Sequence, residues 1–180
     1  MEVLYLLTNL INAIFIKGLF ISILSIMIVG KVLKTDTHNA FVIIKGIILV
    51  YAGLNIGYYF VACFSPADMV SIRGRATDSY NFAYYIMLVP NTLLPLLLLF
   101  KKVGRNKYLL LALAFLMNIG WMFELFVIYN TNLHREHLAT QLSFNYLWFI
   151  VLEGLFVGSV IYAIGRIIKR KTTDIHTSIS

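Results

Sequence analysis

Five long apolar runs, separated by short polar segments, make up most of the chain. Each run is about 20 residues or longer, which is the length that an α-helix needs to cross the hydrocarbon core of a bilayer. The pattern therefore predicts an all-α integral membrane protein. We expect a bundle of five transmembrane helices that span Thr8–Leu33, Asn39–Phe64, Asn81–Phe100, Tyr108–Thr131 and Phe144–Ile168.

Composition agrees with a membrane protein. Of the 180 residues, 60% are hydrophobic and 13% are charged, whereas a soluble domain has about 45–50% apolar and about 25% charged residues. Five spans and their connections use up the chain, so no soluble domain is expected. Residues 1–168 are predicted to form one transmembrane domain, and residues 169–180 a basic, Ser/Thr-rich cytoplasmic tail.

The charges of the connections predict the orientation of the bundle. Lys31, Lys34 and His38 form a short basic turn at the end of the first run, the basic loop Lys101–Lys107 follows the third, and the basic tail follows the fifth. The other two connections are roughly balanced, so the positive-inside rule places the amino terminus outside and the carboxyl terminus in the cytoplasm. These loops also account for the net charge of +7, and we therefore expect no nucleic-acid partner.

Four charged residues lie at least one helical turn inside the predicted spans: Lys17, Lys45, Glu124 and Glu153. Because a charge in the membrane is costly, such residues are candidates for a proton path or a buried ion pair. By helix rise, Lys17 and Glu153 lie roughly 13 Å deep and Glu124 roughly 10 Å deep, so we expect these three to meet in one layer of the outer leaflet. Lys45 lies one turn from the cytoplasmic end, where its long side chain can also reach the interface. Both the functional and the structural interpretation remain open.

Several kinds of redox and metal site lack their usual ligands. The single cysteine, Cys63, excludes a disulfide within the chain and a four-cysteine metal site. No histidine lies inside a predicted span, so no pair of helix histidines is present to hold a haem, and His134 and His137 lack a third ligand. We therefore predict no metal site, no catalytic residue and no cofactor held by this chain alone.

Small residues, prolines and tyrosines predict features of helix packing. Gly53/Gly57 and Gly154/Gly158 have the spacing that lets two membrane helices approach closely. Pro90 and Pro95 predict a kink, and kinks of this kind either are purely structural or line a cavity. Seven aromatic residues lie mostly in the outer portions of the predicted helices and suit an interfacial belt, although they could also flank a ligand; they are Tyr58, Tyr59, Tyr84, Tyr85, Trp121, Tyr129 and Trp148. The segments 54–58 and 117–121 share an Asn-Ile-Gly core, either by chance or through an old duplication.

One stretch resembles a known family. Its matching residues are Asn118-Ile119-Gly120, Phe123-Glu124, Phe126-Val127-Ile128 and Leu133-His134-Arg135-Glu136, with Arg75-Ala76-Thr77, Tyr80, Asn91, Pro95 and Phe100-Lys101-Lys102 in the same order upstream. Over roughly residues 10–168 the chain resembles the second half of NrfD/PsrC-type integral membrane subunits. The branch that it resembles most is the pair found in alternative complex III, the bacterial quinol-oxidising complex.

The resemblance implies a membrane subunit of a quinone-linked respiratory oxidoreductase complex in the cytoplasmic (inner) membrane of a bacterium. The implied partners are lipid, other membrane subunits, and subunits that carry iron–sulfur clusters and haem, with menaquinone or ubiquinone bound in the complex. Residues that it places at the outer face for partner contact are Arg75, His134, Arg135 and Glu136. The role of this chain would be structural or proton-conducting, through Lys17, Glu124, Glu153 and Lys45, and whether it counts as part of an enzyme is undecided.

The chain also departs from the family pattern. Leu125 stands where the family has arginine, and Glu136 where it has aspartate. The first helix bundle, which holds the quinone pocket of the family, is not represented. Two other classes therefore stay open: a non-catalytic accessory or assembly protein, and a stand-alone small membrane transporter or sensor.

Overall fold

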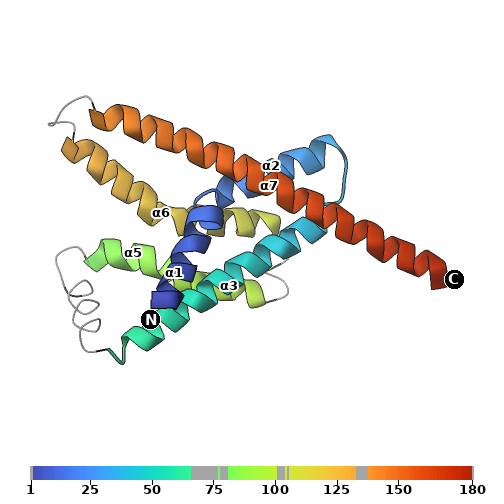
Figure 1. Cartoon of the computed structure of the whole chain (residues 1–180), viewed down its shortest axis with the longest axis horizontal. Helices are drawn as coiled ribbons and strands as arrows, with labels where there is room; N and C mark the ends of the chain where they lie inside the picture. The colour runs from blue at the N-terminus through green and yellow to red at the C-terminus, as the bar shows by residue number, and fades with distance from the viewer. Residues whose placement is uncertain are drawn as a thin grey trace.

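A computed structural model of the chain describes residues 2–65, 77, 81–100, 104, 106–132 and 138–179, without the side chains at 2, 81, 83, 121, 124–132, 138–146 and 171–179. All elements in these ranges are helical. They are α1 (Glu2–Ile11), η1 (Asn12–Ile16, a π-helix), α2 (Leu19–Val32), α3 (His38–Ala62), α5 (Asn81–Thr92), η2 (Leu94–Leu99, a 3₁₀-helix), α6 (Lys107–Asn132) and α7 (Leu138–Ile179). The predicted all-α class is thus confirmed for the described residues (Figure 1).

Three helical segments of the described chain are long and apolar enough to cross a membrane: Val3–Val32, His38–Ala62 and Leu147–Arg170. Shorter apolar helical segments cover Tyr84–Leu99 and Lys107–Gly120. Large apolar side chains are exposed on most of the helices, which suits a lipid environment. The number of spans and their orientation stay predictions.

The first helix is not the single continuous element that the apolar run predicted. It begins at Glu2, not near Thr8, and it is interrupted by the π-helix and by a turn at Lys17–Gly18. The backbone N–H of Lys17 donates to the carbonyl of Asn12 at 3.2 Å, which is the five-residue spacing of a π-turn. On either side of this break, α1 and α2 run in different directions (Figure 1).

Two other helix boundaries also differ from the prediction. The third run is an α-helix only as far as Thr92 and continues as the 3₁₀-helix η2, because Pro90 and Pro95 each remove a backbone donor. The fifth helix extends from Leu138 to Ile179, well beyond the predicted Phe144–Ile168. No glycine or proline follows Gly165, so nothing local ends the helix after it leaves the apolar run.

Helix α7 packs along α2 and α3 through small residues. A Cβ atom added to Gly18 would lie 2.9 Å from the Cα atom of Gly154, and one added to Gly158 would lie 3.0 Å from the Cα atom of Ser22. The predicted Gly154/Gly158 spacing is therefore a real packing surface. The predicted Gly53/Gly57 pair does not make a close helix contact at Gly53, because a Cβ atom added there would meet nothing within 4 Å.

The α2–α3 connection is held against α7 by polar contacts. Lys169 donates to Asp36 at 2.9 Å, and the hydroxyls of Thr35 and Tyr162 are 2.6 Å apart. The bond from Lys169, together with the backbone N–H of His38, holds the pKa of Asp36 below its ordinary value, so this contribution is present at neutral pH and is lost in acid. Because both partners of the ion pair are about half exposed, its contribution to stability is small. We call this end of the bundle the basic end; it holds Lys31, Lys34, Arg166, Lys169 and Arg170.

Candidate functional site

A polar cavity of about 560 Å³ lies between α1/η1, α3, α5 and α6. Polar and tyrosine side chains dominate its described lining. The lining residues are Tyr5, Thr8, Asn9, Asn12, Lys17, Tyr51, Asn55, Tyr58, Tyr59, Tyr84, Met87, Leu88, Asn91, Thr92, Met117, Asn118 and Gly120. Its volume falls within the range of roughly 300–1,000 Å³ that is typical of small-molecule sites.

The break in the first helix forms one end of this cavity. The series of helical backbone hydrogen bonds is interrupted at Lys17–Gly18. The side-chain amide of Asn118 donates to the carbonyl of Ile16 at 2.8 Å in place of a backbone donor. The hydroxyl of Ser22 lies 2.7 Å from the carbonyl of Gly154 and 3.0 Å from that of Gly18. The break is therefore held by side chains from α2 and α6 and by the backbone of α7.

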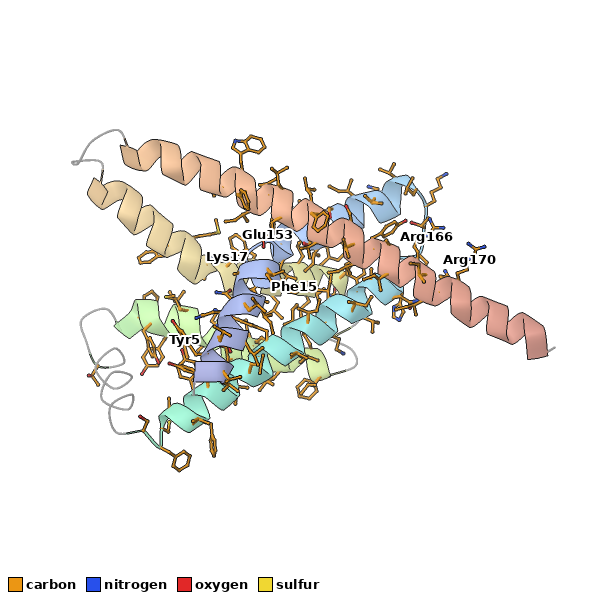
Figure 2. The ribbon with its side chains drawn as sticks, in the orientation of Figure 1. Tyr5, Phe15, Lys17, Glu153, Arg166 and Arg170 are labelled. Atoms are coloured by element: carbon orange, nitrogen blue, oxygen red, sulfur yellow. The ribbon has the colours of Figure 1, made fainter. Side chains whose placement is uncertain are left out.

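The opposite end of the cavity is lined by tyrosines from three helices. The rings of Tyr5 and Tyr58 are 6.0 Å apart, and those of Tyr58 and Tyr59 are 5.5 Å apart. The hydroxyl of Tyr59 hydrogen-bonds with Tyr84 on α5. Figure 2 shows Tyr5 at this end of the first helix and Lys17 at the other. The cavity thus has a tyrosine-lined end and a lysine-lined end.

Lys17 lies beside Glu153 where the broken helix crosses α7 (Figure 2). Their glycine neighbours, Gly18 and Gly154, make the close backbone contact of this crossing, and the charge of Lys17 acts on the Glu153 carboxyl group. The structure therefore brings together two of the three residues expected in one layer. The side chain of Glu124 lies outside the described part of the chain, so the complete layer stays a prediction.

Lys45 lies apart from this group. Its ammonium covers Gly104, in the connection between η2 and α6, so that a Cβ atom at Gly104 would be 2.6 Å from Nζ. Lys45 does not belong to the described lining of the cavity. The other predicted site residues, Arg75, His134, Arg135 and Glu136, lie outside the described residues.

Sequence reasoning found only part of the cavity. It singled out Lys17 as a charge inside a span, and it named Asn91 among the residues that carry the family resemblance. It favoured an interfacial belt for Tyr58, Tyr59 and Tyr84 and left open that they flank a ligand; all three line the cavity. A usable signal was the shared Asn-Ile-Gly core, because Asn55 and Asn118 line the same cavity from α3 and α6.

The described side chains include no group of three His, Cys, Asp or Glu residues that could hold a metal ion. The chain was compared with protein-family models, with curated proteins and with solved structures, and none of them matches.

Proposed function

We propose that this chain is a membrane subunit of a quinone-linked respiratory oxidoreductase complex of the NrfD type. In this proposal it supplies a structural and proton-conducting helix bundle in a bacterial inner membrane. The iron–sulfur clusters and haem belong to partner subunits, and menaquinone or ubiquinone is bound in the assembled complex.

The observation that carries the proposal is the position of the polar cavity. Asn91, Asn118 and Gly120 are among the residues that carry the family resemblance, and all three line it. Gly120 packs against Met87 of α5, and Asn118 fixes the helix break. The resemblance and the cavity thus point to the same part of the bundle.

A proton path through a membrane needs ionisable groups that are linked by water or by hydroxyl groups. The cavity supplies a polar route from the tyrosine-lined end to Lys17, and Glu153 lies next to Lys17. We propose Glu124 as a further station near this pair and Lys45 as a station toward the basic end. These four residues would connect the two faces of the membrane.

A tagged chain, expressed in its own host and extracted in mild detergent, should co-purify with subunits that carry iron–sulfur clusters and haem. Mass spectrometry and the visible haem spectrum of the eluate would measure this. Replacing Arg135 and Glu136 together by alanine should reduce recovery of these subunits, because both lie in the proposed contact surface. Lys169→Ala, at the basic end, is the matched control and should leave recovery unchanged. Purification of the wild-type chain without any redox subunit would contradict the proposal.

The proposed topology has five spans, with the amino terminus outside and the carboxyl terminus in the cytoplasm. We predict that a cysteine at position 132 reacts with a membrane-impermeant maleimide in intact cells and that one at position 178 does not. Native Cys63 is exposed, so Asn132→Cys and Ser178→Cys would be made in a Cys63→Ala background. After membrane disruption both cysteines should react. The reverse pattern in intact cells would overturn the orientation.

A second candidate is a stand-alone membrane transporter or sensor, and the volume of the cavity favours it. A protein of this kind needs a site large enough for a small molecule and no redox partners. The co-purification experiment separates the two functions, because a transporter or sensor would be recovered without iron–sulfur and haem subunits.

A further inference from the structure

The basic end gathers positive charge from two segments that are far apart in the sequence. Residues 31–38 and 166–174 together contain six lysines and arginines and two aspartates, a net charge of +4 with histidine neutral. Besides the ion pair and the hydroxyl contact described above, the side-chain amide of Asn39 donates to the carbonyl of Gly165 at 3.4 Å. A Cβ atom added to Gly165 would lie only 2.8 Å from the backbone nitrogen of Ala40. The connection between α2 and α3 is therefore seated on α7, and the two charged segments meet there.

Arg166 and Arg170 form the accessible part of this charge. They are four residues apart, so they lie on one face of α7 (Figure 2). Both are exposed, and together with Ile167 and Lys169 they line an open hollow of about 430 Å³. In the part of the chain that the structure describes, Lys169 is paired with Asp36, whereas neither arginine has an ion-pair partner. Because a guanidinium group can bind phosphate through two parallel hydrogen bonds, these two arginines suit a phosphate group.

Lys34 occupies a backbone position that favours glycine. Its φ angle is 50°, and no other non-glycine residue in the described ranges has a positive φ. The backbone N–H of Thr35 donates to the carbonyl of Gly30 at 3.0 Å, so Lys34 closes the end of α2 in the left-handed conformation. Glycine adopts this conformation without steric cost, whereas the Cβ atom of a lysine makes it strained. A use for the positive charge that this residue adds to the basic end would offset the strain.

The apolar surface of the bundle reaches these charges. All three membrane-length segments have one end here, because Val3–Val32 and Leu147–Arg170 finish at the basic end and His38–Ala62 starts there. Large apolar side chains close to the charges in sequence are exposed; they are Val32, Leu33, Ile164, Ile167 and Ile168. In a bilayer, hydrocarbon gives way to headgroups at such a boundary. A ligand that matches both surfaces has apolar chains joined to an anionic group.

We propose that the basic end is a binding site for an anionic phospholipid. Arg166 and Arg170 bind its phosphodiester, Lys34 adds to the attraction from the α2–α3 connection, and the acyl chains lie along the exposed isoleucines of α7. A zwitterionic phospholipid binds less well, because the surplus positive charge of this end repels its ammonium group. An acidic protein segment would neutralise the arginines but leave the isoleucines uncovered. The site needs only that the bundle lies in a membrane, so it does not depend on a respiratory role.

Native mass spectrometry of the full chain in detergent would test this proposal by titration with two lipids that have identical acyl chains. Phosphatidylglycerol is anionic, and phosphatidylcholine is zwitterionic. We expect the first phosphatidylglycerol to bind at least roughly fivefold more tightly, because each basic residue near a membrane surface contributes about this factor. Equal affinity for the two lipids would overturn the proposal. Displacement of phosphatidylglycerol by an equal concentration of inorganic phosphate would also overturn it, since the site would then take the free anion.

Variants of the two arginines locate the site. Arg166→Gln and Arg170→Gln should each weaken phosphatidylglycerol binding about fivefold and leave phosphatidylcholine binding unchanged. Arg170→Lys keeps the charge and should retain most of the affinity. Lys107→Gln is the matched control, because it removes one exposed positive charge at the start of α6, outside the hollow. An equal loss in Lys107→Gln would overturn the proposal, since the lipid would then respond to the overall charge of the chain.

Lys34→Gly separates lipid binding from folding. The substitution removes the charge and the backbone strain together, so phosphatidylglycerol affinity should fall about fivefold while the thermal unfolding temperature stays the same or rises. Circular dichroism of the same detergent sample would measure the unfolding temperature. Unchanged affinity, or a loss of affinity that comes with a lower unfolding temperature, would overturn this role of Lys34.

Discussion

Replacing Gly154 by alanine is expected to lower the thermal unfolding temperature of the purified chain by about 3–10 °C. The added Cβ atom would lie 2.6 Å from the Cβ atom of Ile21 and 2.7 Å from the carbonyl oxygen of Gly18. The second neighbour is backbone, so relief requires α2 and α7 to separate. Separation also lengthens the 2.7 Å hydrogen bond from Ser22 to the Gly154 carbonyl. Forced overpacking of this kind costs about 1–3 kcal/mol.

Gly53→Ala is the matched control for this experiment. A Cβ atom at Gly53 meets nothing within 4 Å, and alanine is the better helix former by about 0.5–1 kcal/mol. The unfolding temperature of Gly53→Ala should therefore stay the same or rise slightly. Thermal unfolding in detergent, followed by far-ultraviolet circular dichroism, would measure both variants. Equal effects of the two substitutions would show that α2 and α7 do not depend on this crossing.

The membrane-length elements of the fold were predictable from local sequence. Apolar runs reveal them because each residue in a span must be compatible with lipid, whatever the rest of the chain does. The proline-containing third run likewise carried a local signal for its change to a 3₁₀-helix at Leu94–Leu99.

The break at Lys17–Gly18 carried only a weak local signal. No proline lies near it, and a single glycine such as Gly18 is tolerated inside many helices. Its stability comes from Asn118 and Gly154, which are more than 100 residues away in the chain. A break of this origin can be found only once the packing of α6 and α7 is known.

The candidate site was predictable in its parts but not as a cavity. A lysine inside an apolar run stands out in any sequence, so Lys17 was found. Tyrosines are common both at membrane interfaces and in binding sites, and residue type alone does not separate the two. Tyr5 and Tyr84 come to the same space only because α1 packs on α3 and α3 on α5.

Asn118→Leu is expected to destabilise the purified chain by about 1–2 kcal/mol. Asn118 is only 6% exposed, and its amide donates at 2.8 Å to the carbonyl of Ile16, where the helical ladder is interrupted. Leucine has nearly the same shape but no donor, so this carbonyl would lose its partner inside the bundle. A buried polar group without a partner costs more than an average hydrogen bond contributes.

Asn55→Leu provides the comparison, because Asn55 occupies the equivalent place in the shared Asn-Ile-Gly core. It is 9% exposed, it lines the same cavity, and its amide donates to the carbonyl of Tyr51 in its own helix, at 3.1 Å. That carbonyl belongs to the continuous helix α3 and keeps its backbone partner when the side chain is changed. Unfolding by titration with a denaturing detergent should therefore show a clear loss of stability for Asn118→Leu and a smaller one for Asn55→Leu. If the two variants lose equal stability, the cost comes from the polarity of the cavity wall and not from the broken helix.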